Sequence, residues 1–225
     1  MKRRTRIVKY MKLMASGCRW QVKNKIVYTN SDGTVIVLIP GQWYRGIPYT
    51  RGKVKRRFYY AKFLRQLRWG YLFTHHELLG VDCSSAVSYS WRKCCRYFPV
   101  SSTKMIFLDL VTDQKYISNK GRYTISADSS GTKEIITENG TDTLVEAYQA
   151  LQPGDGLLFY DSTQRKGHVM LVSSSVEEGF VEIIDQKGYD VEDPERKTTS
   201  WRNDFRYSYA QLIEEEFIPI YLKFC

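Results

Sequence analysis

Three short apolar segments in the C-terminal half restrict the fold more than any other feature of the sequence. They cover residues 156–160, 168–173 and 180–184, and they are rich in the aliphatic and aromatic residues that favour strands. Only a polar loop at 161–167 and a Glu-Glu-Gly turn at 177–179 interrupt them. Connections as short as these are typical of β-hairpins. The sequence therefore predicts three short strands in succession, and a closing strand at 217–224 that Pro219 confines to an edge or a bulge.

A cysteine stands where a helix is expected to begin. An apolar run at 78–81 leads to Cys83, and from Ala86 toward residue 97 apolar side chains recur at helical spacing. The backbone N–H groups of a first helical turn are unpaired and the helix dipole is positive there, so a thiolate is stabilised. Two interpretations of Cys83 follow: a nucleophile, or a buried structural cysteine, which is common for this residue type.

An imidazole and a carboxylate are expected to meet at one end of the sheet. If the second and third predicted strands are antiparallel neighbours, His168 at the start of one lies beside Asp185 and Gln186 at the end of the other. A histidine that takes the proton of a thiol needs a partner on its far nitrogen, which fixes its tautomer and orientation. Asp185 is the better candidate because it shares a strand face with Ile183, and Gln186 is the alternative.

Four short motifs, in this order along the chain, resemble those of the NlpC/P60 family of cysteine peptidases. GIPY at 46–49 is similar to the family's Gly-x-Pro-Tyr loop, and GVDCSS at 80–85 to its Asp-Cys-Ser-Gly nucleophile motif. LQPGDGLLF at 151–159 resembles its Pro-Gly-Asp lead into a strand, and GHVMLV at 167–172 resembles its Gly-His-Val-Gly-Ile strand.

The resemblance implies an α+β fold of the papain-like NlpC/P60 type, in which the helix that carries the nucleophile packs on an antiparallel sheet. It implies Cys83 as the nucleophile and His168 as the base. Asp185 stands at the third polar position, with Gln186 as the alternative.

The same resemblance implies a reaction and its substrate class. Tyr49 would approach the thiolate and help to hold the substrate or the oxyanion, and Asp82 and Ser84 would lie in the groove that recognises a free peptide amine. The reaction implied is hydrolysis of amide bonds in bacterial cell-wall (peptidoglycan) peptides through a thioester acyl-enzyme. No cofactor is implied.

The rest of the chain is expected to complete one compact unit. Residues 1–45 are interpreted as a helix and strand region with a buried strand at 34–39, and 46–225 as the catalytic domain with insertions at about 53–79 and 100–140. The second insertion is expected to hold loops and short strands. The remaining expectations are strands at 105–111, 123–126 and 133–137, helices at 141–151 and 208–215, and a surface loop at 190–206.

The charge balance favours an anionic partner. A net charge of +10 suits nucleic acid, a membrane surface or a charged wall polymer, and residues 53–68 form a basic stretch without an acid. None of the usual nucleic-acid motifs occurs, which disfavours nucleic acid. Two other function classes remain open. One is a transglutaminase-like acyl transferase, which uses Cys, His and Asp in the same order; the other is a non-catalytic module that binds a polyanion or the cell wall.

The cysteines and the N-terminus bear on the cellular setting. Five cysteines leave at least one thiol free, and Cys94 and Cys95 are interpreted as a core-facing and a surface residue of one helix. No signal peptide is visible, so a secreted or envelope location is inferred from the substrate class alone. Basic residues interrupt the one lipoprotein-like stretch at 2–18, which instead predicts an amphipathic helix that carries Ile7, Met11, Met14 and Cys18 on one face.

Neither a membrane span nor a metal site is expected. No apolar run is long enough to cross a bilayer. The Thr-His-His-Glu sequence at 74–77 lacks the i, i+4 spacing that puts two ligands on one helical face.

Overall fold

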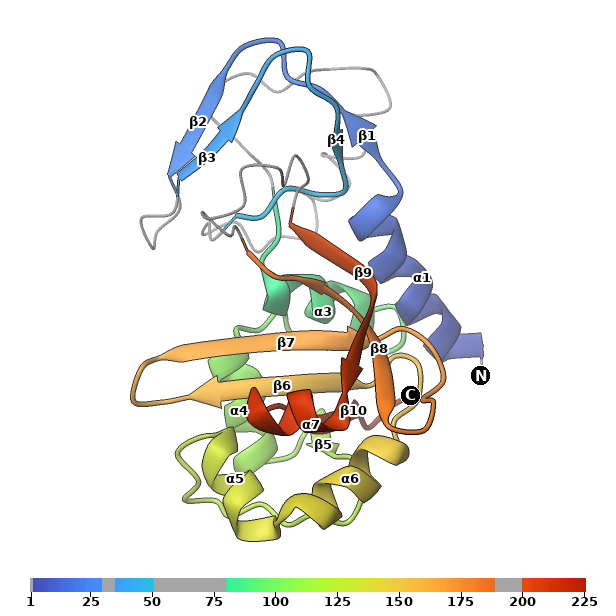
Figure 1. Cartoon of the computed structure of the whole chain (residues 1–225), viewed down its shortest axis with the longest axis vertical. Coiled ribbons are helices and arrows are strands. Elements are labelled where there is room, and N and C mark those ends of the chain that lie inside the picture. Colours follow the sequence, from blue (N-terminus) through green and yellow to red (C-terminus); the bar gives the residue numbers. More distant parts are fainter. Residues whose placement is uncertain (1, 30–34, 51–79, 189–199) are drawn as a thin grey trace.

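The computed structural model describes residues 2–29, 35–50, 80–188 and 200–225, and its centre is a six-stranded sheet (Figure 1). Every neighbouring pair in this sheet is antiparallel. The three apolar segments form β6, β7 and β8, so the strands predicted there are confirmed, and the sheet is antiparallel as the family resemblance implies. In spatial order the strands are β5 (Ile117–Asn119), β10 (Ile218–Leu222), β6 (Gly156–Asp161), β7 (Lys166–Val172), β8 (Phe180–Gln186) and β9 (Trp201–Ser208).

Helices pack around this sheet, which makes the protein an α+β structure as expected. α3 packs on β7 and β8, α4 packs on β6 and β7, and α1 packs on α3, β8 and β9. The helices α5 and α6 lie together, against β6 and β10 respectively. The described helices are α1 (Lys2–Ser16), α3 (Cys83–Trp91), α4 (Thr103–Val111), α5 (Thr132–Asn139), α6 (Thr141–Gln149) and α7 (Tyr209–Glu214).

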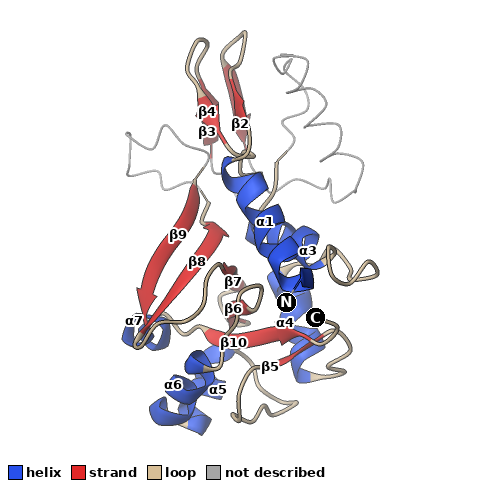
Figure 2. Cartoon of the chain, turned by 90° about the vertical axis from the view of Figure 1, so that its right-hand side faces the viewer, coloured by secondary structure: helices blue, strands red, loops and turns tan. Residues whose placement is uncertain are grey.

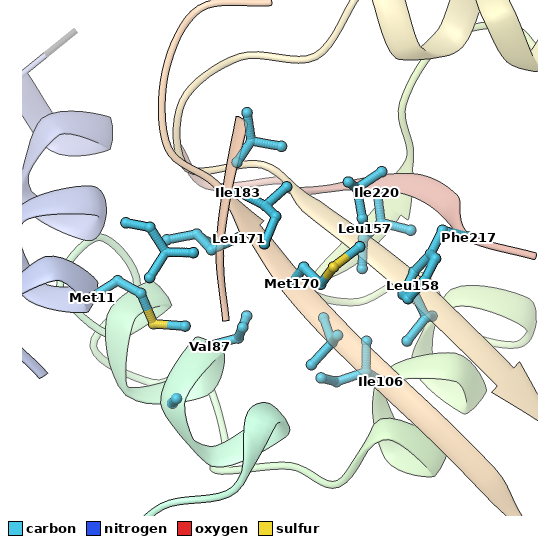
Figure 3. Close-up of a cluster of buried hydrophobic side chains, with 14 of the residues drawn as sticks. Met11, Val87, Ile106, Leu157, Leu158, Met170, Leu171, Ile183, Phe217 and Ile220 are labelled. Carbon is cyan, nitrogen blue, oxygen red and sulfur yellow. The ribbon is translucent and has the colours of Figure 1, made fainter. Parts of the chain in front are cut away.

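The core between the helices and the sheet fixes where α3 lies (Figure 3). α1, α3 and α4 contribute Met11, Val87 and Ile106, all almost fully buried, and the strands contribute Leu157, Leu158, Met170, Leu171, Ile183 and Ile220. Burying a side chain of this size stabilises the fold by about 1.5–3 kcal/mol, so these contacts hold the N-terminus of α3 at a set distance from β7.

The N-terminal amphipathic helix is confirmed as α1. Ile7, Met11 and Met14 are completely buried against the central core, whereas Cys18 follows the last helical residue, Ser16. Among the described helices none is both long and apolar enough to span a membrane.

A strand forms within the expected range of 34–39, but the prediction that it is buried is wrong. Residues 35–38 form β3 (Val35–Leu38), which pairs with β2 (Ile26–Thr29) in a separate hairpin, and β1 (Arg19–Trp20) pairs with β4 (Tyr44–Arg45). Leu38 is buried, but Val35 and Val37 are 49% and 42% exposed. A two-stranded hairpin can cover a core with one face only, and the unbroken apolar run concealed this alternation.

The prediction of short strands at three places within 100–140 is wrong. Residues 105–111 lie in α4 and 133–137 in α5, residues 123–126 form no strand, and β5 is the one strand within 100–140. The Ser102 hydroxyl caps α4 by accepting a hydrogen bond from the Met105 N–H. Apolar residues lie on the exposed as well as the buried side of this helix, which is why its pattern resembled a strand. The other predicted insertion, at 53–79, lies outside the described residues.

The predicted loop at 190–206 is also corrected in part. Residues 189–199 lie outside the described part of the chain, but residues 201–208 form β9, an edge strand paired with β8. Residues 203–206 of β9 are exposed, and all of them except Phe205 are polar or charged like those of a loop. The helices expected at 141–151 and 208–215 are confirmed as α6 and α7.

Pro219 lies in an interior strand with a regular register, not at the expected edge or bulge. β10 has β6 on one side and β5 on the other. The carbonyl of Pro219 accepts a hydrogen bond from the Lys120 N–H on the β5 side, so its ring nitrogen faces that side too. Because β5 ends at Asn119, opposite Ile220, the proline nitrogen lies where no ladder bond is needed.

The interpretation of Cys94 and Cys95 as residues of one helix is wrong. α3 ends at Trp91, short of the expected residue 97, and Cys94 lies in the following turn, where it forms a disulfide with Cys225. Cys18, Cys83 and Cys95 are free thiols, so the expectation of at least one free cysteine is confirmed.

Candidate active site

Cys83 is the first residue of α3, and its neighbours build the helix N-terminus around it. The Asp82 Oδ1 atom caps the helix by accepting hydrogen bonds from the Ser85 N–H at 2.7 Å and the Ser84 hydroxyl at 2.9 Å. The other end is anchored by Trp91, whose Nε1 donates to the Gly154 carbonyl at 3.0 Å. The Cys83 sulfur therefore lies at the positive end of a helix that is fixed against the sheet.

His168 and Asp185 come from neighbouring strands. β7 and β8 pair at Leu171–Ile184, and continuing this register places Asp185 two residues along from the position opposite His168, on the same face. The His168 Nε2 and Asp185 Oδ2 atoms are 2.5 Å apart. The two side chains thus meet, as expected, but as a diagonal pair rather than as directly opposed residues.

The His168 ring also forms a hydrogen bond with the Cys83 side chain. Because Nε2 faces Asp185, Nδ1 is the ring nitrogen left for the sulfur. Burial disfavours a charged ring, but the charges and hydrogen bonds of Cys83 and Asp185 outweigh it and raise the pKa of His168 to about 10. The ring therefore keeps its proton at neutral pH, with the Cys83 sulfur on one side and the Asp185 carboxylate on the other.

Arg202, which the sequence does not predict as a site residue, holds the Asp185 carboxylate from the opposite side. Its Nε donates to Asp185 Oδ1 at 2.9 Å and its Nη2 to Oδ2 at 2.6 Å, a bidentate pair with a completely buried carboxyl group. Burial raises the pKa of Asp185, but the hydrogen bonds and charges of His168 and Arg202 prevail and hold that pKa below its usual value. Asp185 therefore stays ionised.

The guanidinium continues a chain of contacts toward the cavity wall. Arg202 Nη1 donates to the Tyr207 hydroxyl at 2.7 Å, and that hydroxyl donates to Glu215 Oε2 at 3.1 Å. Arg202 is the direct cross-strand partner of Asp185, so it is identifiable only once residues 201–208 are assigned to a strand. The alternating aromatic residues Phe205 and Tyr207 are the one signal in the sequence for that assignment.

Gln186, the alternative third residue, has a different set of partners. It is completely buried, its Nε2 donates to the Ile47 carbonyl at 3.1 Å, and its Oε1 accepts from the Ser200 hydroxyl at 2.7 Å. The Trp201 Nε1 donates to the same Ile47 carbonyl at 2.7 Å. Gln186 thus fixes the loop at 46–49 to the sheet, and Asp185 contacts the histidine.

The loop at 46–49 lies beside the nucleophile. Tyr49 forms a parallel bridge with Val81, and the Val81 N–H donates to the Pro48 carbonyl at 3.0 Å. Gly46 has a φ of +78°, and a Cβ there would lie 2.2 Å from the Ala15 carbonyl oxygen, so this turn requires glycine. The motif at 46–49 is therefore a tightly packed link between α1, the sheet and Cys83.

A cavity of about 940 Å³ opens over these residues. All the predicted site residues except Asp185 line it: Tyr49, Asp82, Cys83, Ser84, His168 and the alternative third residue, Gln186. Asp185 lies behind His168. Phe159, Phe205 and Phe217 supply apolar wall, and Arg165, Lys166 and Lys187 supply cations. Its volume falls within the range of pockets that bury a drug-sized ligand, which is also enough for a short peptide.

Within the described residues no group of three or more His, Cys, Asp or Glu side chains is placed to hold a metal ion. The Thr-His-His-Glu sequence at 74–77 and the basic stretch at 53–68 lie outside the part of the chain that the structure describes. Comparisons with family models, curated proteins and solved structures found no match to this chain.

Proposed function

We propose that this protein is a cysteine peptidase or amidase of the papain-like NlpC/P60 type that hydrolyses amide bonds in bacterial cell-wall peptides. One observation carries the proposal: Cys83 at a helix N-terminus is hydrogen-bonded to His168, whose far nitrogen contacts the buried carboxylate of Asp185. A nucleophile, a base and an orienting group in this order form a catalytic triad.

In the acylation step the Cys83 thiolate attacks the carbonyl carbon of the scissile amide. The Cys83 backbone N–H, unpaired in the first turn of α3, donates to the developing oxyanion. As the C–N bond breaks, the His168 imidazolium transfers its proton to the leaving nitrogen, which departs as an amine. The product is a thioester on Cys83.

In the deacylation step the same ring acts as a base. The thioester carries no charge, so one of the influences that raise the pKa of His168 is lost and the neutral ring persists to lower pH. The ring takes a proton from water, the hydroxide attacks the thioester, and the acid product leaves as the thiolate reforms. Asp185 holds the ring in one orientation through both steps.

The substrate class rests on the four motifs. The Asp82 Oδ1 atom is used by the helix cap, whereas Oδ2 accepts no hydrogen bond from the described residues and is the atom we assign to a substrate amine. Tyr49, beside Cys83 in the cavity wall, is assigned to the substrate or the oxyanion. The Cys94–Cys225 disulfide suits the secreted or envelope location that such a substrate requires.

The test is cleavage of purified muropeptides, followed by chromatography and mass spectrometry of the products. Cys83→Ala and Cys83→Ser are expected to abolish cleavage, whereas Cys18→Ala and Cys95→Ala, which remove the other free thiols, are expected to retain it. Cleavage that survives in both Cys83 variants would rule out the proposal.

The same assay separates the two rival functions. With an added primary amine, a transglutaminase-like enzyme would yield amine-substituted product and little free acid, while a hydrolase yields the acid. A non-catalytic module would show salt-sensitive binding to the polymer that is unchanged by Cys83→Ala, with no cleavage by the wild type.

A further inference from the structure

The β2–β3 hairpin carries an apolar face that covers nothing in the described structure. Val27 pairs with Val37 across the hairpin, and alternation puts Val35 and Ile39 on the same side. These four side chains are 57%, 42%, 49% and 52% exposed, in that order. We call them the hairpin face. The opposite side of the hairpin holds the buried residues that attach it to the body of the protein, Ile26 and Leu38.

Cations accompany this face. Lys23 and Lys25 are exposed in the segment between β1 and β2. Arg19 stacks on the indole of Trp43, which is 55% exposed, with its guanidinium carbon 5.0 Å from the ring centre. In the sequence, Asp32 is the single acidic residue before Glu77, so the whole N-terminal third is cationic.

The charge of the molecule is therefore separated along its length. The hairpin lies at one end and the helices α5 and α6 at the other (Figures 1 and 2). The far end is acidic: α5 and α6 carry one cation, Lys133, and the acids Glu134, Glu138, Asp142 and Glu146. In the field of an anionic surface such a molecule orients with the hairpin toward that surface.

The combination of residues selects among anionic partners. The lysines would attract nucleic acid and charged wall polymers. These polymers, however, have no apolar layer in which the four exposed aliphatic side chains could be buried. The interface of a bilayer offers both, because anionic headgroups attract Lys and Arg while the acyl boundary accepts aliphatic residues and Trp.

We propose that the hairpin face, with Trp43, Lys23 and Lys25, is a docking surface for an anionic lipid bilayer. The hairpin lies at headgroup depth and does not cross the membrane. This inference is independent of the reaction at Cys83.

Co-sedimentation with vesicles tests the proposal. Wild-type protein is expected to bind vesicles of phosphatidylcholine mixed with phosphatidylglycerol and to bind phosphatidylcholine alone weakly. The double variant Val27→Ser/Val37→Ser is expected to bind the mixed vesicles about tenfold more weakly, and Lys23→Gln/Lys25→Gln by a similar factor.

Matched changes at the other exposed positions serve as controls. Met105→Ser on α4 removes an apolar side chain that is 55% exposed, and Lys133→Gln on α5 removes a cation with a 78% exposed side chain. Both are expected to leave vesicle binding within about twofold of wild type.

Each outcome decides the question. The proposal would be overturned if the wild type did not bind the mixed vesicles, or if it bound neutral vesicles equally well. It would also be overturned if the valine variant bound as the wild type does while the lysine variant did not. That last result would indicate a surface that binds polyanions through charge alone. If the valine variant does not fold, Trp43 fluorescence replaces it. The wild-type minus Trp43→Phe spectrum is expected to shift to shorter wavelength on mixed vesicles, and an unshifted spectrum counts against the proposal.

Discussion

Among the described residues, the carboxyl groups of Asp155 and Asp185 are completely buried, and both pair with cations. Asp155, just before β6, lies 2.5 Å from Arg4 Nη1 and 3.2 Å from Lys120 Nζ, and it accepts a hydrogen bond from the Gln152 N–H. Its partners tie α1 and the loop after β5 to the start of β6, and none of them lines the cavity.

Asp185 differs from Asp155 because one of its partners contacts the candidate nucleophile. On one side it has Arg202, a cation comparable to Arg4, and on the other it has His168, which contacts Cys83 in the cavity. A buried ion pair by itself thus indicates only that two elements are joined. The functional carboxylate is distinguished by a titratable partner that opens onto a nucleophile.

The largest expected effect on catalysis comes from replacing Asp185, the buried carboxylate that contacts His168. Asp185→Asn is expected to lower kcat/KM by about 10³-fold or more, because the His168 ring loses the group that fixes its tautomer and its charge. The free energy of unfolding is expected to fall by about 3–5 kcal/mol, since Arg202 keeps a buried charge without its counter-ion. Steady-state kinetics and urea denaturation measure the two quantities.

Asp155→Asn is the matched control for this experiment. It removes an equally buried, equally paired carboxylate, so a similar loss of unfolding free energy is expected while kcat/KM of the folded protein stays within about twofold of wild type. Equal catalytic losses in both variants would show that the two carboxylates do not differ as described.

The second effect is on the protonation of His168. An NMR titration is expected to place the pKa of its ring at about 10 in the wild type, with the proton lost as pH rises through that value. Cys83→Ala and Asp185→Asn each remove a negative charge that favours the imidazolium, so each is expected to lower this pKa. Signals of the other two histidines are identified in a His168→Gln spectrum. A wild-type midpoint near 6.5 would contradict the ion pair.

A smaller effect is expected when the bidentate pair is weakened but its charge is kept. Arg202→Lys loses the planar fork, and we expect kcat/KM to fall about tenfold. Because Arg202 helps to depress the pKa of Asp185, this pKa is expected to rise, so activity is lost at a higher pH as the solution is acidified. Arg206→Lys on the same strand, where Arg206 pairs with the exposed Glu177, is the control and is expected to leave the pH profile in place.

The smallest effect concerns that exposed ion pair itself. The side chains of Arg206 and Glu177 are 51% and 66% exposed. Arg206→Gln is expected to lower the free energy of unfolding by at most about 1 kcal/mol, and less at high salt, because water and ions screen the pair. Thermal denaturation at two salt concentrations measures it, and a loss as large as that of Asp155→Asn would refute the distinction between buried and exposed pairs.

Segments with strong local signals were predictable from the sequence. The strands β6, β7 and β8 combine strand-forming residues with short turns, and α1 shows a clear apolar face. The helix α4 was mistaken for a strand because apolar residues occur on its exposed side as well. The edge strand β9 was mistaken for a loop because four consecutive residues of it, 203–206, are exposed and an edge strand can be polar.

Some residues of the candidate site are likewise predictable from the sequence, and others are not. Cys83 and His168 lie in two of the four motifs, and Asp185 ends a predicted strand, so all three are predictable from the sequence. Arg202 and Gln186 act through partners far along the chain, and their roles depend on which residue of β9 or of the loop at 46–49 comes to face them.

The sequence by itself determined two local conformations: a helix that begins at Cys83, and strands that begin and end near His168 and Asp185. It also determined the positive charge of the N-terminal third. The tertiary structure alone decided that Asp185 rather than Gln186 meets His168, that Arg202 clamps it, and that the hairpin face stays uncovered among the described residues. The reason is physical. Local propensity depends on neighbours within a few residues, whereas strand register and burial depend on how distant segments pack together.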